Sequence, residues 1–229
     1  MDFNNKYLWK LFEINGETVY VTETLLATWI IMGVLILFAV IVRLKLKSFK
    51  EIPKGFQNVV EMLVESTSKF TKDTMGKELE FFGGWFFSIA AFILLSNYSG
   101  LFFLRPPTTN LATTAALALL TFILIHATGI IRQKGTYFKN YFSPNPLFFP
   151  LNLIGELATP ISLSFRLFGN ILGGLIIMGI VYHMFPLVLQ FLVPSVLHAY
   201  FDLFSGGIQT FIFVMLSMVF IQDKAYIED

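Results

Sequence analysis

Arg166 is the residue that this sequence most strongly marks for a chemical role. It lies in the stretch ELATPISLSFRLFGNILGG, from Glu156 to Gly174, and no other charged residue occurs from Leu157 to Phe201. A charged side chain at the centre of a membrane-spanning helix costs about 2.5–3.5 kcal/mol on insertion scales, so it is retained where it has a partner or a task. The sequence therefore predicts an intramembrane site centred on this guanidinium.

The helical neighbours of Arg166 are small and polar. At positions −4, +3, +4 and +7 they share its face of a helix, and they are Ser162, Gly169, Asn170 and Gly173. Two glycines four residues apart let another helix approach closely, and serine or asparagine can form a hydrogen bond across such a contact. We therefore expect a docking surface with a fixed positive charge. Ordinary helix packing is an alternative explanation of the glycines.

A second polar stripe occurs further along the chain. Its members fall at i, i+3, i+4, i+7 and i+11, and they are Asp202, Ser205, Gly206, Gln209 and Phe213. If the two segments pair antiparallel about a turn near Pro186 to Val188, position 166 faces position 209. The pattern then predicts that Arg166 and Gln209 lie close together.

Two acids flank the arginine on opposite sides of this hairpin, Glu156 on the first arm and Asp202 on the second. A carboxylate in a membrane span usually lines a water-filled path or pairs with another charge. With a permanently protonated arginine between them, the acids suggest two half-paths that do not connect directly. Two simpler readings remain: a structural ion pair of Asp202 with Arg166, and an interfacial end charge at Glu156.

Composition indicates an integral membrane protein. Of the 229 residues 55% are hydrophobic and 14% are charged, against about 25% charged in ordinary soluble domains. The first twenty residues contain no apolar run long enough for a secretory signal, so we expect no cleavage. The chain has no cysteine, and it shows no metal-binding cluster, phosphate-binding loop or nucleophile triad, so we expect no catalysis, no cofactor and no metal. We expect no nucleic-acid partner.

The expected fold is all-α, as a single membrane domain with three upright spans, a surface amphipathic helix and a long, strongly tilted C-terminal hairpin. The charge-free runs place spans at 25–42, 81–104 and 111–131, the last two as antiparallel neighbours, and the apolar periodicity places the surface helix at 54–73. The hairpin arms are expected at 151–184 and 195–222. Upright they would reach roughly 50 and 42 Å, against a hydrocarbon core of about 30 Å, so a steep tilt is predicted.

Lysine and arginine are distributed unequally between the two sides of this topology. Twelve lie on the side of the loop after the first span, and only Lys6, Lys10 and Arg105 lie on the other. The positive-inside bias therefore predicts an outside N-terminus and a cytoplasmic C-terminus.

At these motifs the sequence resembles subunit a of the F-type rotary ATP synthase. The resemblance rests on PISLSFRLFGNILGG around Arg166 and GGIQTFIFVMLSMVF around Gln209, with weaker support from IPKGFQNVVEMLVE. It implies a non-catalytic stator subunit in a bacterial plasma (inner) membrane, in contact with membrane lipid, with a rotating c-ring and peripheral stalk b subunits as partners. ATP chemistry would reside on other subunits.

The resemblance also implies roles for individual residues. Arg166 would face the ion-binding carboxylates of the ring, with Asn170 and Gln209 as its polar supports. Ions would enter near Asp202 and leave near Glu156. Ser162, Gly169, Gly173 and Gly206 are the expected ring contacts.

The chain departs from the family pattern at three positions. Nine residues after the arginine, where some members have glutamate, it has Leu175, and Asp202 stands where those members have histidine. Asn110 aligns loosely with a frequent aspartate. We therefore expect the acid of the outer path on the second arm, without a histidine partner; the sequence leaves open whether the ion is a proton or sodium.

Two other classes of protein compete with the stator. A self-contained secondary transporter or ion channel could use the same buried charges, but such transporters commonly show two related halves, and this chain shows none. A purely structural membrane scaffold would not need Arg166.

Overall fold

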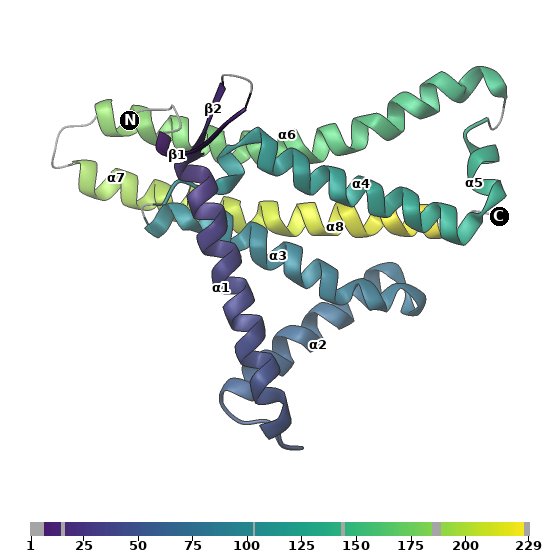
Figure 1. Ribbon diagram of the computed structural model, residues 1–229, viewed down its shortest axis with the longest axis horizontal. Helices are drawn as coiled ribbons and strands as arrows, with labels where there is room; N and C mark the ends of the chain where they lie inside the picture. The colour runs from purple at the N-terminus through teal and green to yellow at the C-terminus, as the bar shows by residue number, and fades with distance from the viewer. Residues whose placement is uncertain (1–6, 15–16, 103, 143–144, 185–188, 227–229) are drawn as a thin grey trace.

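The computed structural model describes residues 7–14, 17–102, 104–142, 145–184 and 189–226. Its first element is a β-hairpin that the sequence analysis did not foresee. Strands β1 (Tyr7–Ile14) and β2 (Glu17–Thr22) pair antiparallel. The hairpin leads directly into α1 (Glu23–Lys45), whose first turn is capped by Thr22, because its Oγ1 accepts a hydrogen bond of 3.3 Å from the backbone N–H of Leu25. The strands therefore stand at the beginning of the first apolar helix (Figure 1).

Helix α1 packs against little of the rest of the chain. Only 11% of its most apolar window is buried, and its last turn carries Arg43 and Lys45. A 3₁₀ turn, η1 (Leu46–Ser48), and a loop connect it to α2 (Phe56–Met75), which occupies most of the range expected for the surface helix. The chain then returns through Gly76, at φ +85°, and η2 (Lys77–Phe82). In Figure 1, α1 and α2 form two sides of a wedge that is closed by α3.

The core lies where α3 (Gly83–Tyr98), α4 (Leu111–Gln133) and the C-terminal hairpin meet, and short 3₁₀ turns η3 (Ser99–Phe102) and η4 (Pro107–Thr109) connect α3 to α4. Its fully buried side chains include Phe86, Ile93, Leu167, Phe213 and Met218. Helix α8 (Gly206–Ala225) lies between α3 and α4 and packs against both. The short connection between α3 and α4 predicted that they are direct neighbours, and this prediction was wrong.

The first arm of the hairpin is one continuous helix. After α5 (Gly135–Asn140) and η5 (Pro146–Phe148), α6 (Phe149–Met184) runs for 36 residues and passes through Pro160 without a break. At about 1.5 Å per residue it extends roughly 54 Å, well beyond a hydrocarbon core of about 30 Å. A helix of this length fits in a bilayer only when it is inclined.

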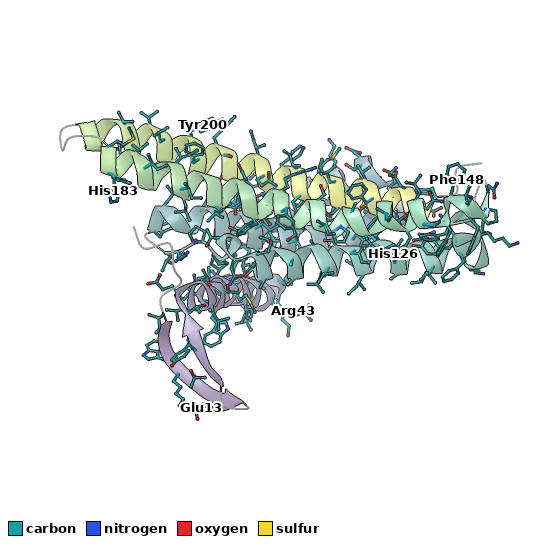
Figure 2. All side chains as sticks on the ribbon, turned by 90° about the horizontal axis from the view of Figure 1, so that it is seen from above. Glu13, Arg43, His126, Phe148, His183 and Tyr200 are labelled. Atoms are coloured by element: carbon teal, nitrogen blue, oxygen red, sulfur yellow. The ribbon has the colours of Figure 1, made fainter. Side chains whose placement is uncertain are left out.

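The second arm consists of three pieces. They are α7 (Leu189–His198), a seven-residue π-helical segment η6 (Ala199–Ser205), and α8. Both Figures 1 and 2 show α4, α6 and α8 lying along one another, whereas α1 crosses them steeply. Helix α4 thus follows the direction of the hairpin arms rather than that of α1.

The fold class is confirmed as an all-α integral membrane protein. In the described part of the chain, five helices are long and apolar enough to cross a membrane. They correspond to the three expected spans and the two expected arms.

Candidate functional site

Arg166 lies on the exposed side of α6. Leu163, Ser164 and Leu167 on the opposite side of this helix are buried, and Ser164 Oγ lies 3.2 Å from Thr114 Oγ1 of α4. These contacts fix the rotation of α6 about its axis, because they place the side of the helix that carries Leu163, Ser164 and Leu167 in the core. No hydrogen bond or ion pair reaches Arg166 from the described residues. The guanidinium is therefore presented outward, away from the bundle.

Open space surrounds two of the glycines near Arg166. A Cβ atom added at Gly169 or Gly173 would meet nothing within 4 Å, whereas one added at Gly174 would lie 3.3 Å from Cβ of Phe201. Gly174 thus serves packing within the chain. Gly169 and Gly173, together with exposed Ser162, leave a shallow, open surface beside Arg166.

Gly206 is placed differently from the other predicted contact residues. It is buried, and a Cβ atom there would lie 3.0 Å from Cβ of Asn97 on α3. Its backbone carbonyl accepts a hydrogen bond of 3.0 Å from Nδ2 of Asn97. Gly206 therefore lets α8 approach α3, and it lies away from the open surface.

Asn170 joins the two arms of the hairpin. Its Nδ2 donates to Oγ of Ser205 at 2.9 Å, and the same hydroxyl donates to Oδ1 of Asn170 at 3.1 Å. Asn170 is one turn beyond Arg166 on α6, and Ser205 is the last residue of the π-helical segment. The amide therefore supports the Arg166 turn through the second arm rather than through a bond to the arginine itself.

Asp202 has a histidine partner. Nδ1 of His198 lies 2.5 Å from Oδ2 of Asp202, one turn earlier on the same arm, and Nε2 of His198 lies 3.1 Å from the hydroxyl of Tyr182 on α6. The expectation that Asp202 lacks a histidine partner was wrong. The signal was present in the sequence, because residues four apart share a helix face. Asp202 makes no ion pair with Arg166, so the simple structural-pair reading does not hold.

The π-helical segment explains why the second stripe does not lie on a single face. The pattern from Asp202 to Phe213 was read as continuous α-helix, but a π turn closes i→i+5 bonds and rotates everything that follows it. Asp202 lies near Gly100, with its Oδ2 at 3.7 Å from a Cβ built on that glycine. Gln209, two turns later, is turned into the core.

Gln209 is 5% exposed, and among the described residues its Nε2 has no hydrogen-bond partner. No hydrogen bond connects it to Arg166. A buried amide nitrogen without a hydrogen-bond partner costs about 1–3 kcal/mol, so Gln209 is an unsatisfied polar group of the bundle. The structure thus does not bring positions 166 and 209 into direct contact through a hydrogen bond.

Asn97 holds a polar network between α3, α8 and the loop before α4. Its Nδ2 also lies 3.3 Å from Oγ1 of Thr210, and its Oδ1 accepts a hydrogen bond of 2.9 Å from Thr108. Because Asn97 is 1% exposed, these bonds satisfy an otherwise costly buried amide. Asn110, by contrast, caps α4 by accepting from the backbone of Ala112 at 3.0 Å.

Glu156 lies at the far end of the hairpin from Asp202 and forms an ion pair with Lys224 of α8. Both residues line a cavity of about 750 Å³, together with Tyr137, Tyr141, Asn152 and Thr159. The ammonium group of Lys224 also lies 5.7 Å from the ring centre of Tyr141. Glu156 therefore lines a polar cavity and is not an isolated charge at a helix end.

A histidine and two tyrosines extend this polar end of the bundle. The hydroxyl of Tyr137 is hydrogen-bonded to Nδ1 of His126 and lies 2.8 Å from the hydroxyl of Tyr141. Burial, and after it the hydrogen bond with Tyr141, raise the pKa of the Tyr137 phenol well above its usual value. Figure 2 places His126 and Phe148 toward this end, and His183 and Tyr200 toward the turn of the hairpin.

Within residues 7–226, wherever the structure describes them, no group of three or more histidine, aspartate or glutamate side chains is arranged to hold a metal ion. The polar groups instead form two separate sets, one near each end of the hairpin.

Known proteins are similar to this chain over most of its length. The family model described as ATP synthase A chain matches residues 25–222. The protein named "ATP synthase subunit a, sodium ion specific" from Propionigenium modestum is 36% identical, over 91% of this chain and 77% of its own length. Subunit a of ATP synthase from Moorella thermoacetica is 36% identical, over 93% and 94%, and the chloroplastic subunit a of Stigeoclonium helveticum is 34% identical, over 95% and 89%.

Proposed function

Because the chain belongs to the ATP synthase A chain family, we propose that it is the stator subunit a of an F-type ATP synthase and that Arg166 faces the rotating c-ring. The observation that carries this proposal is an exposed arginine on an apolar helix with no partner in the described chain. Such a cation costs about 2.5–3.5 kcal/mol in a span, which a carboxylate supplied by another subunit would offset.

The open surface beside Arg166 suits a close helical partner. Gly169 and Gly173 carry no side chain and Ser162 is small, so a ring helix can approach the backbone of α6 along this side. Gly206 is not part of this contact, since it packs against Asn97. The buried Nε2 of Gln209 and the Asn170 to Ser205 pair act as supports behind the arginine.

Ions pass through two half-paths that the arginine separates. With an outside N-terminus and a cytoplasmic C-terminus, as the lysine and arginine bias favours, Asp202 belongs to the outer half-path and Glu156, with its cavity, to the cytoplasmic one. An ion from outside neutralises a ring carboxylate, that site turns through the lipid, and the ion leaves on the Glu156 side. Each elementary charge contributes about 2.3 kcal/mol per 100 mV of membrane potential, so several ions drive each ATP.

The remaining parts of the assembly follow from this role. The chain itself is non-catalytic, binds no cofactor and couples ion flow to rotation, while other subunits perform ATP chemistry. Its partners are the c-ring, the peripheral stalk b subunits and membrane lipid, in a bacterial plasma membrane.

Replacing the arginine tests the proposal. We expect Arg166→Ala in the complete synthase to abolish ion-driven ATP synthesis in proteoliposomes, because a ring carboxylate then loses its counter-charge at the stator. Co-purification of the c-ring should persist. Arg132→Ala is the matched control, since Arg132 is an exposed arginine paired with Glu78 at 2.7 Å, and it should retain synthesis. Coupled synthesis by the Arg166→Ala complex would contradict the stator role.

A further inference from the structure

A second cavity lies outside the proposed ion pathway, where α1 ends and α2 begins. It has a volume of about 840 Å³, and its lining includes Lys45, Lys50, Lys54 and Phe56. This basic cavity belongs to the loop between α1 and α2, which Figure 1 shows at the bottom of the view, well apart from α4, α6 and α8. None of the residues proposed for ion transport or ring contact lines it, so the stator role leaves it without a function.

Positive charge predominates in the basic cavity. Three lysines line it, and Glu51 is the acid beside them. From the described residues, no ion pair reaches the ammonium groups of these lysines, and the carboxylate of Glu51 makes none. The ammonium group of lysine is a compact charge with three donors, and its hydrogen bonds to phosphate oxygens are strengthened by the charge. The lining is therefore suited to a phosphate group.

The loop that carries these lysines is held in a defined shape by Gln57. This side chain is 9% exposed, and its Oε1 accepts a hydrogen bond of 3.0 Å from the backbone N–H of Lys50, while its Nε2 donates to the Lys50 carbonyl at 2.6 Å. The ring of Phe56 lies 5.0 Å from Nζ of Lys45 and meets the ring of Phe38 of α1 edge to face, with 6.3 Å between ring centres. The lysines therefore belong to a folded loop that is fastened to both helices.

An apolar side of α1 leads directly to this cavity. Leu37, Val40 and Leu44 share a helix face at i, i+3 and i+7, and they are 60%, 48% and 74% exposed. In a bilayer these side chains contact acyl chains, because the rest of the described chain covers little of α1. Leu44 is followed at once by Lys45, which lines the cavity. A phospholipid whose tails lie along this side of α1 would therefore bring its phosphate to the cavity.

We propose that the basic cavity binds the phosphate headgroup of an anionic phospholipid, in the leaflet that the lysine and arginine bias makes cytoplasmic. The cytoplasmic leaflet carries anionic lipids, and basic pockets beside spanning helices on that side bind their headgroups. A lipid bound here connects the end of α1 to the beginning of α2. Its binding does not require that the chain act as a stator.

Photoreactive lipids test this site in the complete synthase. The complex is placed in phosphatidylcholine nanodiscs with a trace of phosphatidylglycerol or of phosphatidylcholine, each with the same diazirine-bearing acyl chain, and labelled peptides are located by mass spectrometry. We expect the phosphatidylglycerol probe to label the end of α1 and the following loop at least about 5-fold more than the phosphatidylcholine probe. One variant that combines Lys45→Gln, Lys50→Gln and Lys54→Gln should lose this preference.

A matched variant removes three lysines from the same side of the membrane. It combines Lys69→Gln, Lys72→Gln and Lys77→Gln, since these lysines are exposed and lie outside the cavity. This variant should keep the preference for phosphatidylglycerol. A loss as large as that of the cavity variant would overturn the site, because the lipid would then respond to surface charge alone.

A single substitution tests whether the shape of the loop matters. Gln57→Ala keeps every lysine but releases the backbone of Lys50, so the preference for phosphatidylglycerol should fall several-fold. Unchanged labelling of this variant would overturn the cavity as a built site. Co-purification of the c-ring reports the assembly of each variant.

Two further outcomes would overturn the lipid as the occupant. Suppression of the labelling by inorganic phosphate, but not by chloride at the same ionic strength, would assign the cavity to a soluble anion. Equal labelling by the two lipids in the complete synthase would show that the cavity does not select an anionic headgroup or that another subunit covers it. The Arg166→Ala complex should be labelled like the unmodified one, so the stator role and the lipid site can fail separately.

Discussion

The amide of Asn170 and the hydroxyl of Ser205 exchange two hydrogen bonds, of 2.9 and 3.1 Å, across the seam between α6 and the π-helical segment. Each residue lies one turn or less beyond a charged group of the proposed pathway, Arg166 on one arm and Asp202 on the other. The pair therefore fixes the distance between the arginine and the outer acid, which lie on different helices.

Ser205→Ala should loosen this seam. Both hydrogen bonds are lost and the Asn170 amide is left without its partner, so we expect a loss of about 1–3 kcal/mol in the free energy of unfolding. ATP synthesis should fall several-fold, because the Arg166 turn is no longer tied to Asp202. Thermal unfolding and synthesis rates in the reconstituted complex measure the two effects. Ser88→Ala is the control, since Ser88 is exposed and, among the described residues, its hydroxyl bonds to the Gly84 carbonyl of its own helix. A Ser205 variant as stable and active as this control would contradict the prediction.

Two glycine substitutions should have opposite effects. Gly206→Ala places a Cβ atom 3.0 Å from that of Asn97, and overpacking of this kind costs about 1–3 kcal/mol of stability. Gly169→Ala meets nothing in the chain and should stabilise the isolated subunit slightly, by up to about 1 kcal/mol of helix propensity. In the complex, however, Gly169→Ala should weaken ring association, since the added methyl group occupies the proposed contact.

Unfolding of the purified subunit and co-purification of the c-ring separate the two glycines. A Gly169→Ala complex with normal ring content and normal synthesis would show that the open surface of α6 is not the ring contact. A Gly206→Ala subunit that unfolds like the unmodified one would show that α8 can move away from α3.

The ion pair at the other end of the hairpin can be tested by a double-mutant cycle. Glu156→Gln and Lys224→Gln should each slow ATP synthesis and destabilise the subunit, because each leaves a half-buried charge without its partner. The double variant should lose less than the sum of the two, with a coupling energy of about 1 kcal/mol, between the values of exposed and buried pairs. Arg132→Gln is the control, since the ion pair of Arg132 with Glu78 is exposed and lies outside this cavity, and it should leave synthesis and stability nearly unchanged. Additive losses would argue that the two residues act independently.

The sequence predicted the membrane class, because charge-free runs are local signals. It also marked Arg166 as a candidate, because a lone charge within a long apolar run is a local signal too. The ends of two helices lie close to those that the apolar runs predict. Helix α4 covers 111–133, where 111–131 was expected, and α6 covers 149–184, where 151–184 was expected. The Asn15–Gly16 dipeptide favours a two-residue hairpin turn and was the available signal for the β-hairpin.

The remaining features depend on contacts between distant parts of the chain. Lys224 lies 68 residues from Glu156, and no spacing rule connects them. The insertion of α8 between α3 and α4 contradicts the usual adjacency of helices joined by a short loop. The π-helical segment has no reliable sequence signature, so the faces of Asp202 and Gln209 were assigned as if the helix were regular.

The rest of the chain covers little of helix α1, since only 11% of its most apolar stretch is buried. Packing within the chain cannot hold such a helix at a set angle, so its two ends, at the β-hairpin and at the loop to α2, must anchor it. In a bilayer, acyl chains then pack against the exposed faces of α1 and become a structural component in their own right. The position of α1 therefore depends on the bilayer around it. A change of bilayer thickness should alter the tilt of α1 before it alters the tilt of the other helices.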